Sequence, residues 1–241
     1  MRYIAFLLCL FLATPCWATA SRSFDGSNDR IGVGTIGASD ADFEFGSGDF
    51  TLAFWVYATA WNDGASRGIC GKKLTDGSTG WLIYNDGGSG TKIDARLLLT
   101  NNFFTATSVT TNTWQHWALT RSGSTVKWYL NGVEDASGTN SSILVGLIDT
   151  TYIGFNETHS GYFSGRLAYF SAYKGKALSV SEITQVMKMP GSVVDSLVAH
   201  LTLLGDSPEL DLSGLGNSGT LTETSTSTDG PPIFLTTGMT Q

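Results

Sequence analysis

Cysteine, proline and charge are all scarce in this chain. It has three cysteines and five prolines in 241 residues, and only 15% of its residues are charged. Cys9 and Cys16 lie within the first twenty residues, so Cys70 would stand alone in the rest of the chain and no internal disulfide could form there. We expect Cys70 to be a small buried residue of a strand, because nothing in the sequence places a base beside its thiol.

Positive charge is in deficit. There are 14 lysines and arginines against 21 aspartates and glutamates, which gives a net charge of −7. A surface of this sign repels phosphate groups and argues against nucleic acid as a partner. No long apolar run follows the first twenty residues, so we expect no membrane span.

Motifs of catalysis are missing as well. The sequence has no G-x-S-x-G, no H-E-x-x-H and no phosphate-binding loop. Its histidines, His116, His159 and His200, lie far apart along the chain. These absences weigh against an enzyme.

The first twenty residues have the pattern of a secretory signal. Arg2 supplies the positive end, residues 3–13 form the apolar core, and Ala18-Thr19-Ala20 is the small-residue cleavage site. We expect cleavage after Ala20 and a protein that is secreted, or periplasmic if the host is Gram-negative.

Strand patterns fill most of the remaining chain. Residues 48–57 predict a strand with one buried face, formed by Phe50, Leu52, Phe54 and Val56. The other face of this strand carries Thr51, Ala53, Trp55 and Tyr57. Residues 113–136 read as two further strands, joined by a turn at Ser122-Gly123-Ser124 and followed by a second turn at Asn131-Gly132.

Several of these segments resemble one family. The pattern W-x-H-x-A-x-T at Trp114–Thr120, followed by Y-L-N-G at 129–132, is similar to the centre of the laminin-G-like jelly rolls of the Laminin G 3 type, in the concanavalin A-like lectin/glucanase superfamily. F-D-G at 24–26 and Y-I-G at 152–154 fit the same family. The resemblance implies an all-β jelly-roll sandwich of two antiparallel sheets. It also implies structural roles for four residues: Trp55, Trp114, His116 and Trp128.

The resemblance also bounds the domain. A-L-S-x-x-E-I at 177–183 predicts one short helix near 180–188, in which Ser179 caps the first turn and Glu182 closes a capping box. Residues 21–225 form the expected single domain. Its last strands, in 193–225, match a segment that many relatives carry first, as in a circular permutation. We expect residues 226–241 to be a flexible tail.

Two sets of residues are candidate ligands. Aromatic side chains beside loops can stack on a sugar ring, or alternatively pack over the open end of the sandwich; they are Trp61, Trp81, Tyr84 and Phe104. Oxygen donors that could bind calcium are Asp25, Asn28 and Asp29 in a glycine turn, with Asp49 as a further donor. The alternative for Asp25 and Asn28 is that they hydrogen-bond their own backbone and fix that turn.

The predicted function is a secreted, non-catalytic, lectin-like module that binds a glycan, with calcium as a candidate cofactor. The alternative is a structural or protein-interaction domain of a surface or virion assembly, with an extracellular protein as partner. A glycoside hydrolase is disfavoured, because the paired carboxylates E-x-D-x-x-E of the glucanase branch are absent. The nearest approach is Glu209-Leu210-Asp211.

Overall fold

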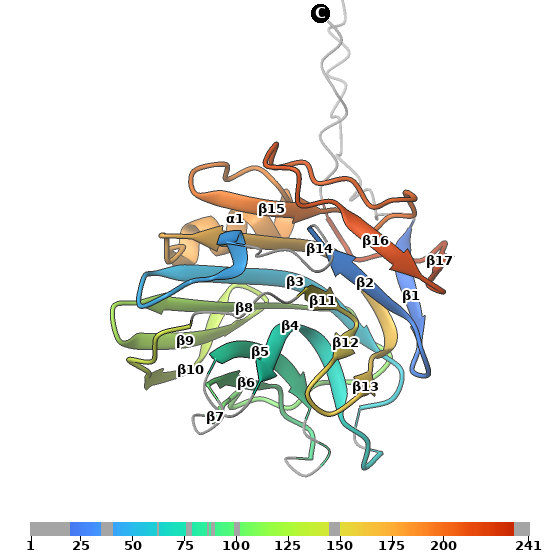
Figure 1. Ribbon diagram of the computed structural model, residues 1–241, viewed down its shortest axis with the longest axis horizontal. Helices are drawn as coiled ribbons and strands as arrows, with labels where there is room; N and C mark the ends of the chain where they lie inside the picture. Colours follow the sequence, from blue (N-terminus) through green and yellow to red (C-terminus); the bar gives the residue numbers. More distant parts are fainter. Residues whose placement is uncertain are drawn as a thin grey trace, which may run out of the picture.

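The computed structural model describes residues 20–34, 41–61, 63–75, 79–85, 87, 90–98, 102–144 and 150–233. Within these ranges two antiparallel sheets pack face to face, and one helix lies on the outside of the sandwich (Figure 1). This arrangement confirms the predicted all-β sandwich of the jelly-roll kind. The predicted signal segment lies outside the described residues, apart from Ala20.

The larger sheet, sheet A, is centred on two long strands. Its order is β10 (Val133–Thr139), β9 (Thr125–Leu130), β8 (Gln115–Ser122), β3 (Phe50–Ala58), β14 (Ser164–Lys174), β1 (Ser21–Asp25) and β17 (Ser225–Ser227). Strand β14 has 11 residues, long enough to pair with β1 along its first half and with β15 (Leu197–Leu201) along its second. Sheet A therefore joins both ends of the described chain.

The second sheet, sheet B, covers the inner face of sheet A. Its order is β16 (Gly219–Thr222), β2 (Arg30–Val33), β11 (Thr151–Ile153), β4 (Arg67–Thr75), β5 (Thr79–Asn85), β6 (Asp94–Leu97) and β7 (Asn102–Phe104). A small hairpin, β12 (Phe155–Asn156) and β13 (Gly161–Tyr162), follows β11 directly. A 3₁₀ turn spans Ala41–Phe43.

The core lies between the sheets and follows the alternation of β3. Phe50, Leu52, Phe54 and Val56 are all at most 1% exposed and belong to one apolar cluster. The neighbouring strands add Trp117 and Trp128, whose rings meet edge to face at 6.2 Å. Burying such a side chain stabilises the fold by about 1.5–3 kcal/mol before entropy is counted. Of the predicted structural residues, Trp55, His116 and Trp128 are buried and Trp114 is half-buried.

The helix α1 (Val180–Lys188) covers part of the outer face of sheet A. Its bounds match the prediction, and Ser179 and Glu182 form the predicted capping box. Ile183 and Val186 face the sheet, where Ala53 and Ala118 leave room for them. In the described part of the chain, no helix is long and apolar enough to cross a membrane.

The C-terminal strands close both sheets. Strand β15 pairs with β14 and β16 pairs with β2, so the predicted contribution of 193–225 to the sandwich is confirmed. The tail predicted from residue 226 onward begins too early. Strand β17 pairs with β1, and the Ile233 side chain is 3% exposed. The Ser/Thr-rich composition hid this strand because β17 lies at an exposed sheet edge and needs no apolar side chain.

Candidate functional site

The predicted sugar-stacking aromatics are mostly buried. Trp61 and Trp81 are 1% exposed, and their indole N–H groups donate to the carbonyls of Thr91 (3.1 Å) and Phe43 (3.0 Å). Tyr84 is fully buried. A ring without an exposed face cannot stack on a sugar, so packing within the sandwich replaces the predicted role for these three. Phe104, in β7, is half-buried and stays a candidate.

Tyr84 illustrates how a ring on the outer face of sheet B becomes buried. The Arg96 guanidinium lies 5.2 Å from its centroid, and the His159 ring stacks on it at 5.6 Å. Arg96 and His159 are themselves 3.1 Å apart. A ring covered in this way contributes to packing, although its position beside a loop suggested that it would be exposed.

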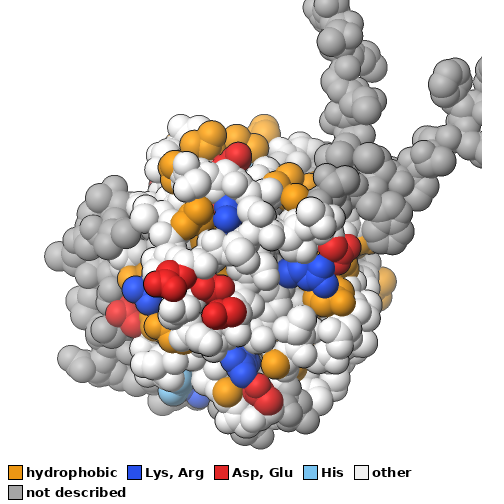
Figure 2. Space-filling model, turned by 90° about the vertical axis from the view of Figure 1, so that its right-hand side faces the viewer, with side chains coloured by type: hydrophobic (Ala, Val, Ile, Leu, Met, Phe, Trp, Pro, Cys, Tyr) orange, Lys and Arg blue, Asp and Glu red, His pale blue; other side chains and the backbone are white. Residues whose placement is uncertain are grey.

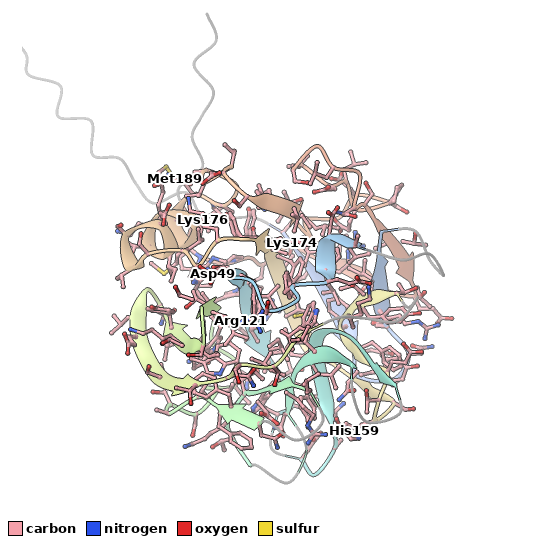
Figure 3. The ribbon with its side chains drawn as sticks, turned by 60° about the vertical axis from the view of Figure 1, so that its left-hand side comes forward. Asp49, Arg121, His159, Lys174, Lys176 and Met189 are labelled. Atoms are coloured by element: carbon pink, nitrogen blue, oxygen red, sulfur yellow. The ribbon has the colours of Figure 1, made fainter. Side chains whose placement is uncertain are left out.

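Asp49 lies far from the other three predicted calcium ligands. Asp49 precedes β3 beside Lys174, at one end of β14, whereas Asp25 pairs with Ser164 at its other end. Ten residue steps of strand separate the two ends, about 30 Å at ~3.3 Å per residue. Figure 3 shows Asp49 beside Arg121, on the side that carries α1. Asp49 accepts a hydrogen bond from the Gly123 N–H (2.7 Å) and fixes the β8–β9 turn.

The other three donors stabilise the β1–β2 turn. Asp25 accepts from the Ser27 N–H at 2.7 Å, and Asp29 accepts from the Asp25 N–H at 2.8 Å. The Asn28 side chain donates to Glu223 at 2.9 Å. Burial raises the pKa of Asp29, and the negative charges of Asp25 and Glu223 add to this effect, while the hydrogen bond from the Asp25 backbone opposes it.

This turn does not match a calcium site. Calcium takes six to eight oxygen ligands. Among the described residues, no three Asp, Glu, His or Cys side chains are arranged to hold a metal ion. The carboxylates of Asp25 and Asp29 instead accept backbone hydrogen bonds. For Asp25 this is the alternative that the sequence left open, whereas the Asn28 side chain donates to Glu223 and not to the backbone.

An aromatic and arginine cluster lies next to this turn. Arg30, at the start of β2, is 5.9 Å from the Tyr152 centroid and 5.5 Å from the Phe155 centroid. Its Nη1 donates to the Tyr162 hydroxyl at 3.2 Å. Phe155 and Tyr162 stack at 4.5 Å across the β12–β13 hairpin. Arg30, Tyr152 and Tyr162 are half-buried, so each keeps a face toward solvent.

Local sequence explains this arrangement. Thr151 and Ile153 point inward, so Tyr152 between them points outward. Gly154, at φ +79°, passes against the Phe24 ring where a Cβ would clash, and lets the chain turn from β11 into the hairpin. The hairpin then places Phe155 and Tyr162 beside Arg30.

Arg67 ties the cluster to the turn. Its Nη1 donates to the carbonyls of Gly26 (3.3 Å) and Tyr162 (3.2 Å), and its guanidinium pairs with Asp63. We call Arg30, Tyr152, Phe155 and Tyr162, with Asn28 and Glu223 at the rim, the Arg30 surface. Figure 2 views this side of the molecule, where acidic side chains gather near the middle and basic ones lie around them.

Ser171, His200 and Glu209 are buried polar residues that make structural contacts. The Ser171 hydroxyl lies 2.9 Å from His200 Nδ1, but Asp211 accepts from the backbone N–H of His200 and not from its ring. Ser171, His200 and Asp211 therefore do not form a catalytic triad. Glu209, the nearest approach to a glucanase carboxylate pair, is fully buried in an ion pair with Arg22.

Sequence reasoning missed the residues of the Arg30 surface other than Asn28, which it named only as a candidate metal ligand. The alternation around Tyr152 was a usable signal, because its neighbours are the buried positions of β11. For Arg30, Phe155 and Tyr162 no local signal exists. Their proximity depends on the β2–β11 pairing and on the hairpin that follows.

The comparisons with known proteins agree with this fold. A candidate carbohydrate-binding protein of Bacteroides ovatus ATCC 8483 superposes with a TM-score of 0.68 at 20% identity, over 91% of this chain and 62% of its own. This chain therefore spans less than two thirds of that protein. A heptameric SAP-like pentraxin of Limulus polyphemus superposes with a TM-score of 0.56 at 14% identity, over 87% of this chain and 95% of its own. No curated protein matches the chain.

At these identities, the structural likeness shows the fold alone. The family model is more specific, because it matches the sequence itself over residues 31–184. That span runs from β2 to α1 and includes the central hairpin and the three aromatic residues of the Arg30 surface, Tyr152, Phe155 and Tyr162. The chain is a member of the Laminin_G_3 family, within the concanavalin A-like lectin/glucanase superfamily.

Proposed function

We propose that this protein is a secreted, non-catalytic, lectin-like module that binds carbohydrate on the Arg30 surface. The observation that carries the proposal is the pair of half-exposed tyrosines, Tyr152 and Tyr162, held beside Arg30 and a polar rim. Tyrosine offers an apolar ring face together with a polar hydroxyl, and a pyranose ring presents the same two kinds of surface.

The rim supplies hydrogen bonds of both kinds. Arg30 and the Asn28 amide are donors for sugar hydroxyls, whereas Glu223 and Asp25 are acceptors. Asn28, Glu223 and Asp25 are exposed, so a ligand can reach them. The carboxylates, together with the net charge of −7, favour an uncharged sugar over an acidic one.

The Bacteroides ovatus protein supports the proposal through its fold and its candidate carbohydrate-binding role. The secretory pattern of residues 1–20 supports export. Calcium is not part of the proposal, because no three Asp, Glu, His or Cys side chains of the described residues are arranged to hold a metal ion.

A glycan array on the purified chain, with and without a chelator, tests the proposal. We expect binding to uncharged glycans that the chelator leaves unchanged. Tyr162→Ala removes the outer ring and Arg30→Ala removes the central donor, so each should weaken binding at least tenfold, a loss of about 1.4 kcal/mol or more. Lys127→Ala, on the exposed face of β9, is the matched control and should bind as the wild type does.

Two results would count against this function. One is an array without any glycan bound by the wild type. The other is full affinity in both Arg30→Ala and Tyr162→Ala, which would place the sugar elsewhere. If both the chelator and Asp25→Ala abolish binding, calcium takes part in the site.

A protein-interaction role is the second candidate, and a different observation favours it. Leu210, Leu212 and Leu215, in the β15–β16 loop, are 52–60% exposed. Asp211 holds this loop in place by accepting from the backbone N–H groups of Ser213 and Asn217 at 2.9 Å. Figure 2 shows hydrophobic side chains gathered at that end of the molecule. Leu212→Ser would weaken protein capture and leave glycan binding unchanged.

A further inference from the structure

The outer face of sheet A carries a second aromatic cluster, beside α1 and apart from the Arg30 surface. Trp55, Ala168, Tyr169 and Ile233 are buried together there, and Trp114 packs against them. Trp55 and His116 occupy paired positions of β3 and β8, and their rings meet at 5.3 Å. The Trp55 indole donates to the carbonyl of Met187 at the end of α1 (3.3 Å).

Three buried polar atoms of this cluster have no hydrogen-bond partner in the described part of the chain. They are Trp114 Nε1, His116 Nδ1 and the Tyr169 hydroxyl. Leaving such an atom unpaired destabilises the folded protein, because the atom has lost its hydrogen bonds to water. Trp117 Nε1 also lacks a partner, but Trp117 lies in the main core on the opposite face of sheet A. The outer cluster therefore combines aromatic rings with several unpaired polar atoms.

One side of the cluster reaches solvent through half-buried residues. The rings of Tyr57 and Trp114 are 5.6 Å apart, and the Arg166 guanidinium lies 3.8 Å from the Tyr57 centroid. Arg166 pairs with Asp229 at 2.6 Å, so its charge is balanced. Burial lowers the pKa of His116 to about 3, so its ring is uncharged at neutral pH. The cluster therefore presents no net charge to a ligand.

A short C-terminal segment covers the cluster. Asp229 follows β17, and its carbonyl accepts from the Ser21 hydroxyl at 2.6 Å. Four residues later the Ile233 side chain enters the cluster and is 3% exposed. The burial of a single isoleucine side chain is a contact that a small ligand can replace.

We propose that this cluster is a second binding site, for a single uncharged sugar residue, and that Ile233 covers it until the ligand displaces this side chain. The aromatic rings take the apolar face of the sugar, and its hydroxyl groups pair with Trp114 Nε1, His116 Nδ1 and the Tyr169 hydroxyl. The site lies on the opposite sheet from the Arg30 surface and does not depend on it.

The test follows the indole N–H signal of Trp114 by NMR, identified by its loss in Trp114→Phe. The probes are D-glucose, D-galactose, L-fucose and N-acetyl-D-glucosamine. We expect at least one sugar to shift this signal saturably in the wild type, and to bind at least threefold more tightly to Ile233→Ala, because no cover then competes. Arg30→Ala should bind this sugar as the wild type does, which separates this site from the Arg30 surface.

Tyr169→Phe removes one of the unpaired polar atoms and keeps its ring. If this atom awaits a ligand, the variant melts at the wild-type temperature or above and binds the sugar at least fivefold more weakly. A melting temperature that falls in Tyr169→Phe would assign the hydroxyl a structural role and overturn the proposal. The absence of any saturable shift in both the wild type and Ile233→Ala would overturn it as well.

Discussion

His116 is a histidine held away from solvent at the centre of sheet A. Its side chain is 2% exposed, and burial lowers its pKa from 6.5 to about 3. Between these values the unfolded chain binds a proton that the folded protein does not bind. The free energy of unfolding must therefore fall as the pH falls through this window, by at most about 1.4 kcal/mol per pH unit for one such group.

We predict that His116→Gln flattens this part of the stability profile. Denaturant unfolding of the wild type between pH 6.5 and pH 4 should show a decreasing free energy of unfolding, and the variant a shallower decrease. Equal slopes in wild type and His116→Gln would mean that His116 is protonated in the folded protein.

Single-residue exposure was the hardest property to predict from the sequence. Trp61 and Trp81 both lie next to loops, and each is buried because its indole N–H finds a backbone carbonyl at the end of the sandwich. Conversely, Tyr152 was predicted only as a strand residue and proves to be half-exposed. Exposure depends on which loop folds over a ring, and a single sequence does not contain that information.

At the scale of elements, α1 shows how local signals define a boundary. The Ser179 side chain accepts from the Glu182 N–H, and the Glu182 carboxylate accepts from the Ser179 N–H at 2.9 Å. Hydrogen bonds from Lys176 and Ser179 lower the pKa of Glu182 to about 2. The capping box thus fixes the first turn of a helix that covers sheet A.

Ser179→Ala should destabilise the protein by about 1 kcal/mol through loss of the cap. Thermal unfolding would show this as a melting temperature lower by about 2–4 °C for a domain of this size. Val180→Ala, one residue later on the exposed side of the helix, should have a smaller effect. A cap variant that melts with the wild type would mean that packing alone positions α1.

Strands with one buried face could be predicted from the sequence. A strand with no buried face could not, because its side chains do not alternate. The alternation in β3 and the Asn131-Gly132 turn, with φ values of +51° and +82°, follow directly from residue type. Strand β17, with the sequence Ser-Thr-Ser, has no such pattern and forms because β1 offers it a free edge. The Arg30 surface also had no local pattern in the sequence. Its residues meet through the β2–β11 pairing and the β12–β13 hairpin that follows.

At the scale of the whole molecule, the two ends of the chain stabilise each other. Strand β1 lies between β14 and β17, and Arg22 in β1 forms a buried ion pair with Glu209. Strands from both ends of the described chain therefore lie side by side in sheet A. The predicted circular permutation fits this arrangement, because a strand can complete the same sheet from either end of the chain.

A chain that ends at Thr224 should be less stable than the full chain by about 2–3 kcal/mol, because it loses the β17 pairing and the buried Ile233. Denaturant unfolding measures this difference. Ile233→Ala in the full chain separates the contribution of the side chain from that of the strand. Unchanged stability on truncation would mean that residues 225–233 are the dispensable tail that the composition suggested.

The location of a bound glycan tests the central claim most directly. A crystal structure of the protein with the tightest glycan from the array should show a sugar ring against Tyr152 or Tyr162, with a hydroxyl group in hydrogen-bonding distance of Arg30. A glycan that binds with its rings elsewhere, and leaves the Arg30 surface empty, would contradict the account.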